Sequence, residues 1–215
     1  MLARRILALA RSIGTVPTLR AAPRWLLRPT YIVAVTDLSR PLPPVPADPA
    51  VRLVPLREGD MGEALAIDPR LTEAAICRRL AEGEQCVLVW HEGVATHCVW
   101  WTDHRVYLPY LGRAFQPLPG DRLCVDVASR PAWRGRGIDA AASVIYLHTL
   151  RELGYRRAMS LVASWNAPAL AVALRRMRGE VAGTVGYWNL GLVRHYVVSG
   201  KVCLDAGGCV HLSPS

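Results

Sequence analysis

The chain has 215 residues, of which 52% are hydrophobic and 20% charged, a composition that fits a folded protein with a substantial core and excludes an intrinsically disordered chain. The formal net charge is +9, and it comes almost entirely from arginine because Lys201 is the only lysine. This charge suits phosphate-bearing ligands, anionic membrane surfaces or nucleic acid, without choosing between them. No apolar run reaches the roughly 18 residues that a transmembrane helix needs.

Residues 1–13 have the pattern of an amphipathic helix, because Leu2, Ile6, Leu9 and Ile13 fall on one stripe and the arginines lie off it. Three interpretations stay open. The helix docks on its own domain, it makes a peripheral contact with an anionic membrane through residues 1–28, or it is an organelle-targeting peptide. A secretory signal is excluded because arginines interrupt the apolar region.

A strand is predicted at Tyr31–Val35, and five prolines between Pro41 and Pro49 then predict an extended connector. We place a domain boundary near residue 50. The predicted organisation is therefore a basic extension with a proline-rich linker (1–50), a main domain (51–200) and a C-terminal tail (201–215).

Within the main domain, hydrophobic periodicity and turn residues predict a regular order of elements. The predicted strands are 51–56, 86–91, 94–101, 123–128 and 157–163, with a closing hairpin of 181–190 and 192–198. The predicted helices are 60–67, 72–82, 140–153 and 166–179. Residues 107–119 form an irregular insertion that is either a substrate lid or local packing.

The six cysteines are scattered without CxxC spacing, at Cys77, Cys86, Cys98, Cys124, Cys203 and Cys209. This spacing does not favour zinc, so no metal site is predicted. Cysteines in stretches patterned as buried strands and helices are ordinary in a reducing compartment. We therefore expect a cytoplasmic protein, with the peripheral membrane contact left open.

The stretch Arg134-Gly135-Arg136-Gly137-Ile138-Asp139 stands between a predicted strand and a predicted helix. Glycines let a backbone approach phosphate closely, and the first N–H groups of a helix point at it with the positive end of the helix dipole. The two arginines add bidentate donors. The stretch thus predicts an anion site, with an ordinary surface turn as the alternative.

Together with the order of elements, this loop resembles the GNAT acetyltransferase superfamily over about residues 51–200. That family has an Arg/Gln-x-x-Gly-x-Gly/Ala loop after its fourth strand, and Asn followed three residues later by Ala or Ser at the start of the next helix. Residues 134–139 and Asn166-Ala167-Pro168-Ala169 resemble these two motifs. The resemblance implies an α/β (α+β) fold with a central mixed, mostly antiparallel sheet of six to seven strands and about four flanking helices.

The resemblance also implies an acyl-CoA-dependent N-acyltransferase, with acetyl-CoA or another acyl-CoA as cosubstrate and direct attack by a small amine in a ternary complex. A basic extension before the domain is similar to GNAT-like proteins of cell-envelope polysaccharide synthesis, which points to an amino-sugar or cell-envelope precursor as the acceptor. The implied cosubstrate-binding residues are Val127, Ala128, Arg134, Gly135, Arg136, Gly137, Ile138, Asp139 and Asn166. For Asn166, capping of its own helix is an equal explanation.

Two positions depart from the family's pattern. Asp139 stands where the family usually has Gly or Ala, and its carboxylate would repel pyrophosphate unless the side chain points away. Ala173 lies near the place of a tyrosine that protonates the departing thiolate in many members. A catalytically degenerate domain that binds acyl-CoA as a sensor or scaffold is therefore the alternative function.

Asp126 is the first candidate for general base or substrate anchor, because it lies on the strand beside the expected thioester. Strand alternation predicts that it shares the face of Cys124. The alternative for Asp126 is a paired structural carboxylate. Tyr187 and Tyr146 are candidates to replace the missing acid.

Asp103 and His104 follow the third strand of the main domain and could reach the same cleft. His97 and His195 are interpreted as strand histidines and not as bases. The sequence is compatible with a homodimer, and no aromatic–basic interleaving supports nucleic acid as a partner.

Overall fold

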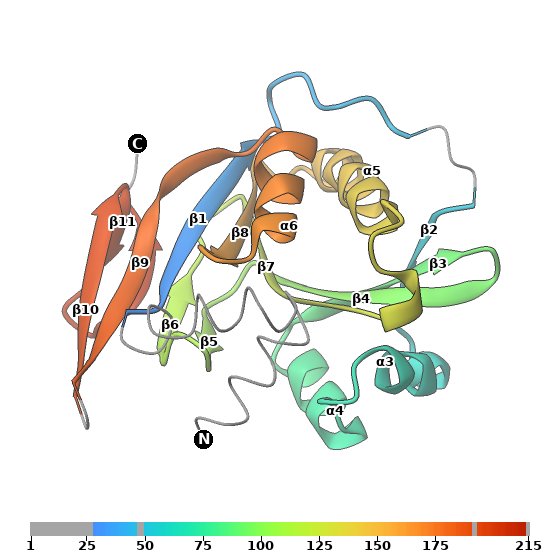
Figure 1. Ribbon diagram of the computed structural model, residues 1–215, viewed down its shortest axis with the longest axis horizontal. Coiled ribbons are helices and arrows are strands. Elements are labelled where there is room, and N and C mark those ends of the chain that lie inside the picture. The colour runs from blue at the N-terminus through green and yellow to red at the C-terminus, as the bar shows by residue number, and fades with distance from the viewer. Residues whose placement is uncertain (1–27, 47–49, 191–192, 214–215) are drawn as a thin grey trace.

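The computed structural model describes residues 28–46, 50–190 and 193–213 (Figure 1). The amphipathic pattern of residues 1–13 lies outside the described residues, as does nearly all of the proposed membrane contact at 1–28. In the part of the chain that is described, no helix is both long enough and apolar enough to cross a membrane.

In the part of the chain that the structure describes, eight strands form the main sheet, in the order β10-β9-β1-β8-β7-β4-β3-β2. Among these eight described strands, β7 and β8 run parallel and the other neighbours are antiparallel. The strands are β1 (Thr30–Asp37), β2 (Arg52–Pro55), β3 (Gln85–His91), β4 (Val94–Thr102), β7 (Asp121–Ser129), β8 (Arg157–Ala163), β9 (Glu180–Leu190) and β10 (Val193–Gly200). The expected mixed, mostly antiparallel sheet is confirmed, with more strands than the six or seven expected.

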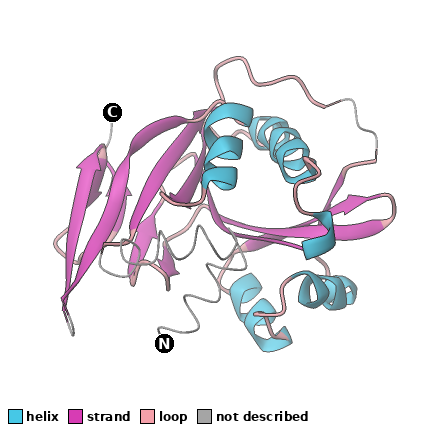
Figure 2. Cartoon of the chain, in the orientation of Figure 1, coloured by secondary structure: helices cyan, strands magenta, loops and turns pink. Residues whose placement is uncertain are grey.

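Helices cover both faces of this sheet (Figures 1 and 2). On one face lie α3 (Met61–Ile67) and α4 (Glu73–Ala81), which follow the short 3₁₀ helix Glu58–Asp60. On the other face lie α5 (Ile138–Glu152), preceded by the 3₁₀ turn Pro131–Trp133, and α6 (Ala167–Leu170). The four predicted helices are confirmed, but the last one continues from α6 as a π-helical segment, Ala171–Arg176.

Each helix is held by the apolar side chains that it buries. Ala64 and Ile67 of α3 and Ile76 of α4 pack with Leu88 and Trp100 on one face. On the opposite face, α5 buries Leu147 and Leu150 with Val87, Trp101 and Ala158. These contacts fix α5, and therefore the loop before it, on the face opposite α3 and α4.

A second, four-stranded sheet has the order β11-β12-β6-β5. Its strands are β5 (Val106–Leu108), β6 (Arg113–Gln116), β11 (Val202–Leu204) and β12 (Val210–Leu212). Apolar residues of this small sheet, among them Phe115 and Val210, share a core with Val33 and Val185 of the main sheet. The insertion that was expected to be irregular is therefore partly β-structure, and the C-terminal tail completes it.

The strand β1 lies inside the main sheet, although the sequence places it before the predicted boundary near residue 50. It pairs with β8 on one side and with β9 on the other, and its Val33 is fully buried. The division of the chain into three separate units, with limits at 1–50, 51–200 and 201–215, remains a prediction. In the described residues the main sheet combines β1 from the first segment with seven strands from the second, which is why it has eight strands, and the third segment contributes β11 and β12 to the small sheet.

Candidate functional site

The parallel strands β7 and β8 separate halfway along their length. Their pairing covers only Asp121–Cys124 with Arg157–Ser160. Beyond that point β7 pairs with β4 alone, through Ala128 and neighbouring residues, and β8 pairs with β1. Within the described residues, one edge of β7 from Val125 to Ser129 therefore has no strand partner, and the main-chain groups of Val127 and Ala128 border the gap.

The loop from Arg134 to Asp139 begins where β7 ends and opens α5. Gly135 and Gly137 have φ of 75° and 79°, a left-handed conformation that disfavours any other residue. A Cβ atom added at either glycine would meet no atom within 4 Å. The glycines therefore serve the backbone conformation and leave open space beside the loop.

The start of α5 presents several free amide groups. Gly137 is the N-cap and offers no side chain, and the first main-chain bond of the helix runs from the Ala141 N–H to the Gly137 carbonyl at 3.0 Å. Among the described residues, the N–H groups of residues 135–140 have no hydrogen-bond partner. Unpaired amides at a helix N-terminus form an anion site.

The two arginines of the loop are exposed beside these amides. One Nη of Arg134 donates to the carbonyl of Ser129 at 3.2 Å, and the guanidinium of Arg136 lies 4.7 Å from the ring centre of Trp133. The guanidinium groups of both arginines are thus exposed next to the amides, where they could contact a phosphate-bearing ligand.

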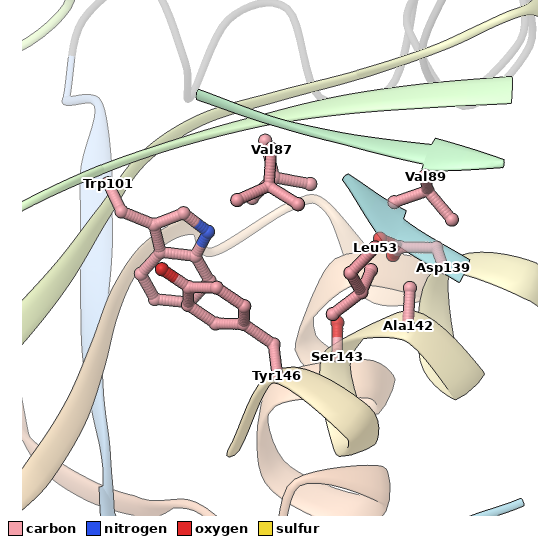
Figure 3. Close-up of a pocket in the computed structure, with 9 residues that line it drawn as sticks. Leu53, Val87, Val89, Trp101, Asp139, Ala142, Ser143 and Tyr146 are labelled. Carbon is pink, nitrogen blue, oxygen red and sulfur yellow. The ribbon is translucent and has the colours of Figure 1, made fainter. Parts of the chain in front are cut away.

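The side chain of Asp139 lines a pocket between α5 and the sheet, away from the outer side of the loop (Figure 3). The pocket is shallow and open to solvent, and its sheet side is formed by apolar residues such as Leu53, Val89 and Val99. Burial raises the pKa of this carboxyl group. The repulsion expected between Asp139 and pyrophosphate is reduced, because the side chain occupies the inside of the helix–sheet interface.

Asn166 caps α6, as the alternative interpretation predicted. Its Oδ1 accepts a hydrogen bond from the Ala169 N–H at 3.3 Å, and Pro168 occupies the first turn of the helix. Within the described residues its Nδ2 group has no partner and is available as a donor. Capping and ligand binding are therefore compatible.

Ala173 sits in the π-helical segment and is only 5% exposed, where it packs against Ala34 and Val162. A tyrosine at this position would have to displace the sheet beneath it. A tyrosine does not fit here because this face of the helix packs closely against β1 and β8.

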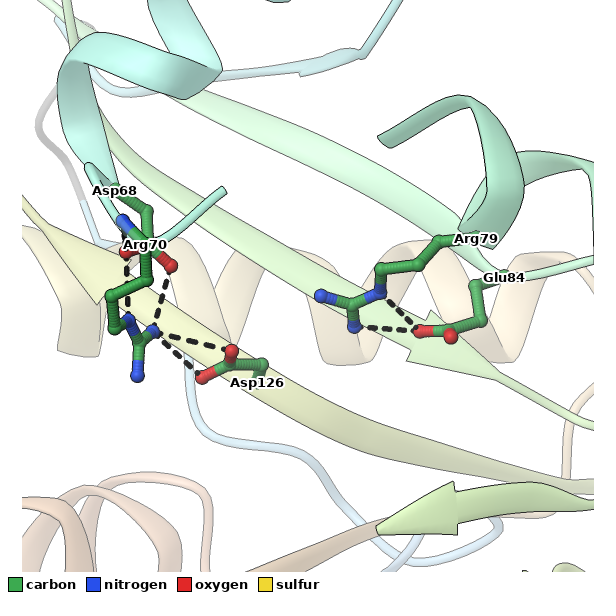
Figure 4. A network of polar contacts seen from close by, with 5 residues as sticks. All are labelled: Asp68, Arg70, Arg79, Glu84 and Asp126. Atoms are coloured by element: carbon green, nitrogen blue, oxygen red, sulfur yellow. Dashed lines mark hydrogen bonds and ion pairs between the residues drawn. The ribbon is translucent and has the colours of Figure 1, made fainter. Parts of the chain in front are cut away.

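The carboxylate of Asp126 on β7 is paired with Arg70, which lies in the loop between α3 and α4 (Figure 4). The Arg70 Nη2 atom lies 3.2 Å from Asp126 and 2.7 Å from the buried Asp68, which Arg70 also binds through Nε. The pairing supports the structural alternative for Asp126. It also holds the carboxylate, whose side chain is 36% exposed, at a fixed place on the α3/α4 face.

The expectation that Asp126 shares the face of Cys124 is wrong. Trp100 pairs with Asp126 and Trp101 pairs with Cys124, which leaves Val125 as an extra residue in a β-bulge. Trp100 packs with the α3/α4 residues, whereas Trp101 and Cys124 pack with α5. The bulge shifts the alternation by one residue and turns Asp126 to the face opposite α5.

The two tyrosines considered as acids both lie in the core. Tyr187 on β9 is 2% exposed, and its hydroxyl donates to the Tyr110 carbonyl at 3.0 Å. Tyr146 stacks on Trp101 with ring centres 4.4 Å apart. These contacts give both side chains a packing role, and the geometry does not support proton transfer to a thiolate by either.

Asp103 and His104 lie at the far end of β7 from the gap, because Thr102 pairs with Leu123. The Asp103 carboxylate accepts a hydrogen bond from Tyr155 at 2.7 Å and lies 3.3 Å from the buried Arg122. These two candidates are thus part of a structural network and do not reach the cleft.

Sequence reasoning missed two residues that border the gap. Arg70 follows a helix with no motif around it, and its contact with Asp126 spans 56 residues. Tyr110 was noted only as part of the insertion, but its ring lies 4.9 Å from that of Tyr31 on β1. In residues 28–46, 50–190 and 193–213, no group of three or more His, Cys, Asp or Glu side chains is arranged to hold a metal ion.

Comparison with solved structures gives the class of fold: the chain has the fold of the GNAT, or GCN5-related N-acetyltransferase, superfamily. The GCN5-related N-acetyltransferase of Sphaerobacter thermophilus aligns with a TM-score of 0.53 and 16% identity over 87% of this chain and 56% of its own. A GNAT-family protein of Novosphingobium aromaticivorans aligns with a TM-score of 0.52 and 19% identity over 74% of this chain and 62% of its own.

A further similar structure is a glucosamine N-acetyltransferase region in a fungal multi-domain β-N-acetylglucosaminidase, with a TM-score of 0.54 and 12% identity over 80% of this chain and 22% of the other. The chain thus spans less than two thirds of the length of each of these proteins. No protein-family model matches the sequence, and no curated protein does.

Proposed function

We propose that the protein is an acyl-CoA-dependent N-acyltransferase that transfers an acetyl group from acetyl-CoA to the amine of a small molecule, such as an amino sugar or a cell-envelope precursor. The observation that carries the proposal is the juxtaposition of two features in a GNAT fold. The free amides at the start of α5 lie directly after β7, and β7 borders the gap that opens when β8 diverges.

The residues fit an acyl-CoA. Its negatively charged pyrophosphate would be held by the amides of residues 135–140 with Arg134 and Arg136, which are exposed beside them. The open edge of β7 at Val127 and Ala128 offers alternating N–H and C=O groups to an extended arm. The free Nδ2 of Asn166 adds a donor on the other side of the gap.

The transfer forms a C–N bond between a neutral amine and the thioester carbonyl carbon and breaks the C–S bond, and the amine proton is lost as the thiol gains one. Asp126 lies on the face opposite α5, so an acceptor would approach the gap from the α3/α4 side. We assign Asp126 the binding of the acceptor's amine, with Arg70 and Asp68 fixing the position of its carboxylate.

The alternative of a non-catalytic acyl-CoA sensor rested on Asp139 and Ala173. The Asp139 carboxyl lines the pocket beneath α5, and Ala173 packs on the sheet. Neither placement obstructs the loop, so the acyltransferase is the function that we retain.

The proposal is tested by release of free thiol from acetyl-CoA in the presence of a panel of amines that includes amino sugars. Release that depends on an amine supports it. Tight CoA binding with no thiol release for any amine would favour the sensor.

The assignment of the loop is tested with Arg136→Glu. A carboxylate in place of a phosphate-binding guanidinium replaces attraction by repulsion, and we expect the Kd for CoA to rise by about 10-fold or more. The matched control is Arg57→Glu, the same change at an exposed arginine before α3, which should leave the Kd within about 2-fold. Equal affinities of the two variants would contradict the assignment.

A further inference from the structure

Three aromatic side chains from separate parts of the chain meet where β7 and β8 diverge. Tyr31, near the start of β1, pairs with Ala163 at the end of β8, beyond the last β8 residue that still pairs with β7. Its ring centre lies 4.9 Å from that of Tyr110 and 5.7 Å from that of Trp165. Tyr110 comes from the insertion after β5, and Trp165 follows the end of β8 by two residues.

Tyr110 packs against the same core cluster as a residue of β7. Val125, the bulged residue on β7, packs against the core that also contains Tyr31 and Tyr110. Burial raises the pKa of Tyr110, and Tyr31, Asp126 and Cys124 raise it further. Within the described residues, this hydroxyl has no hydrogen-bond partner.

The gap has different surroundings on the two faces of the sheet. The amide-rich loop and α5 lie on one face, whereas Tyr31, Tyr110 and Val125 pack on the other with the small sheet. An acyl group that enters from the α5 side therefore advances toward the aromatic rings. A longer acyl chain on this path would meet these rings.

We propose that Tyr31, Tyr110 and Trp165 form an aromatic floor that limits the acyl donor to short chains such as acetyl. The inference rests on the proposed function, since it names the acyl class that the same site accepts. Packed interiors do not yield space for an extra methylene without displacement of side chains, and one methylene in a tight pocket changes specificity by about 10-fold or more.

The main chain around Tyr110 is anchored without its side chain. The Tyr110 carbonyl accepts the hydroxyl of Tyr187 at 3.0 Å, and the Leu111 carbonyl accepts the hydroxyl of Tyr196 at 2.8 Å. Truncation of the Tyr110 ring therefore opens the floor and leaves these loop contacts in place.

The test uses the full chain, the wild type beside Tyr110→Ala and Tyr110→Phe, with acetyl-, propionyl-, butyryl- and hexanoyl-CoA as donors. We expect the wild type to lose about 10-fold or more in kcat/KM between acetyl and butyryl. Tyr110→Ala should recover about 10-fold in the butyryl-to-acetyl ratio of kcat/KM. Tyr110→Phe keeps the ring and should keep the wild-type ratio, which separates size from hydroxyl chemistry.

Trp165→Ala removes a second ring of the floor, which comes from the segment after β8. It is expected to raise the butyryl-to-acetyl ratio of kcat/KM as Tyr110→Ala does. The inference is overturned if the wild type uses hexanoyl-CoA as well as acetyl-CoA, or if both alanine variants fold, bind CoA and keep the wild-type ratio. If no thiol is released from any donor, the proposed function fails. The inference is then decided by binding: the ratio of the Kd values for butyryl- and acetyl-CoA is compared between the wild type and Tyr110→Ala, and an unchanged ratio overturns it.

Discussion

His97 is a buried histidine at the base of the arginine-glycine loop. It lies on β4 opposite Ser129, is 2% exposed, and has a pKa lowered to about 4 by burial and by the positive charge of Arg134. The Thr96 hydroxyl donates to the Val89 carbonyl, so its oxygen accepts the Nδ1–H of His97 at 2.8 Å. This arrangement holds the imidazole neutral, with the proton on Nδ1.

The pKa shift of His97 predicts a pH-dependent stability. The unfolded chain takes up a proton at this residue near pH 6.5, whereas the folded protein does so only near pH 4. The free energy of unfolding should therefore fall as the pH is lowered from about 6.5 to 4, by at most about 3 kcal/mol from this residue. His97→Gln should remove that part of the slope in denaturant titrations.

The control for this prediction is His195→Gln, at an exposed position on β10. It should retain the wild-type dependence of unfolding on pH. A wild-type slope in His97→Gln would show that the buried histidine is not the group that titrates.

Residue-level reasoning from the sequence placed the loop correctly but not its surroundings. Glycine and arginine in residues 134–137 carry a local signal, because backbone conformation and charge are properties of the segment itself. The partner of Asp126 is Arg70, which no local pattern reveals. The β-bulge at Val125 then reversed the face of Asp126, since one extra residue changes the alternation of everything after it.

At the scale of elements, the segments with strong periodicity were predicted within a few residues. The predicted helix 140–153 corresponds to α5, and the predicted strand 157–163 is β8. The short strands β5, β6, β11 and β12 were missed because three or four residues give no detectable period. Their sheet forms only through pairing of β6 with β12, which comes from the far end of the chain.

The start of α5 gives an element-scale prediction. Gly137→Ala places a side chain at φ 79°, which should cost about 1 kcal/mol of stability. Gly62→Ala is the control: this exposed glycine in α3 has free space around an added Cβ, and the change should stabilise the protein by about 0.5–1 kcal/mol. Thermal and denaturant unfolding measure both. A stabilised Gly137→Ala would contradict the need for a left-handed residue there.

At the scale of the whole molecule, the fold brings two chemically different surfaces to one gap. The face with α5 carries the free amides and the arginines, and the opposite face carries Asp126 and Arg70 beside the aromatic floor of Tyr31, Tyr110 and Trp165. Strand β1 supports this arrangement because it supplies Tyr31 and pairs with β8 along the diverging side of the gap.

The central place of β1 predicts how the chain tolerates shortening. Residues 28–215 retain every described strand and should unfold in one cooperative thermal transition. Residues 51–215 lose β1, which leaves β8 and β9 with unpaired edges and removes the buried Tyr31 and Val33 from the core. We expect this shorter chain to give no cooperative transition in calorimetry. A sharp transition would instead support the predicted boundary near residue 50.

The position of β1 also has a consequence for synthesis on the ribosome. Tyr31 is translated well before Ala163 and Val185, with which it pairs. The nascent chain must therefore carry an apolar, unpaired strand until almost all of its partners have left the exit tunnel. High contact order of this kind slows folding and prolongs exposure to aggregation, so efficient production in the cell should depend on chaperones that hold extended apolar segments.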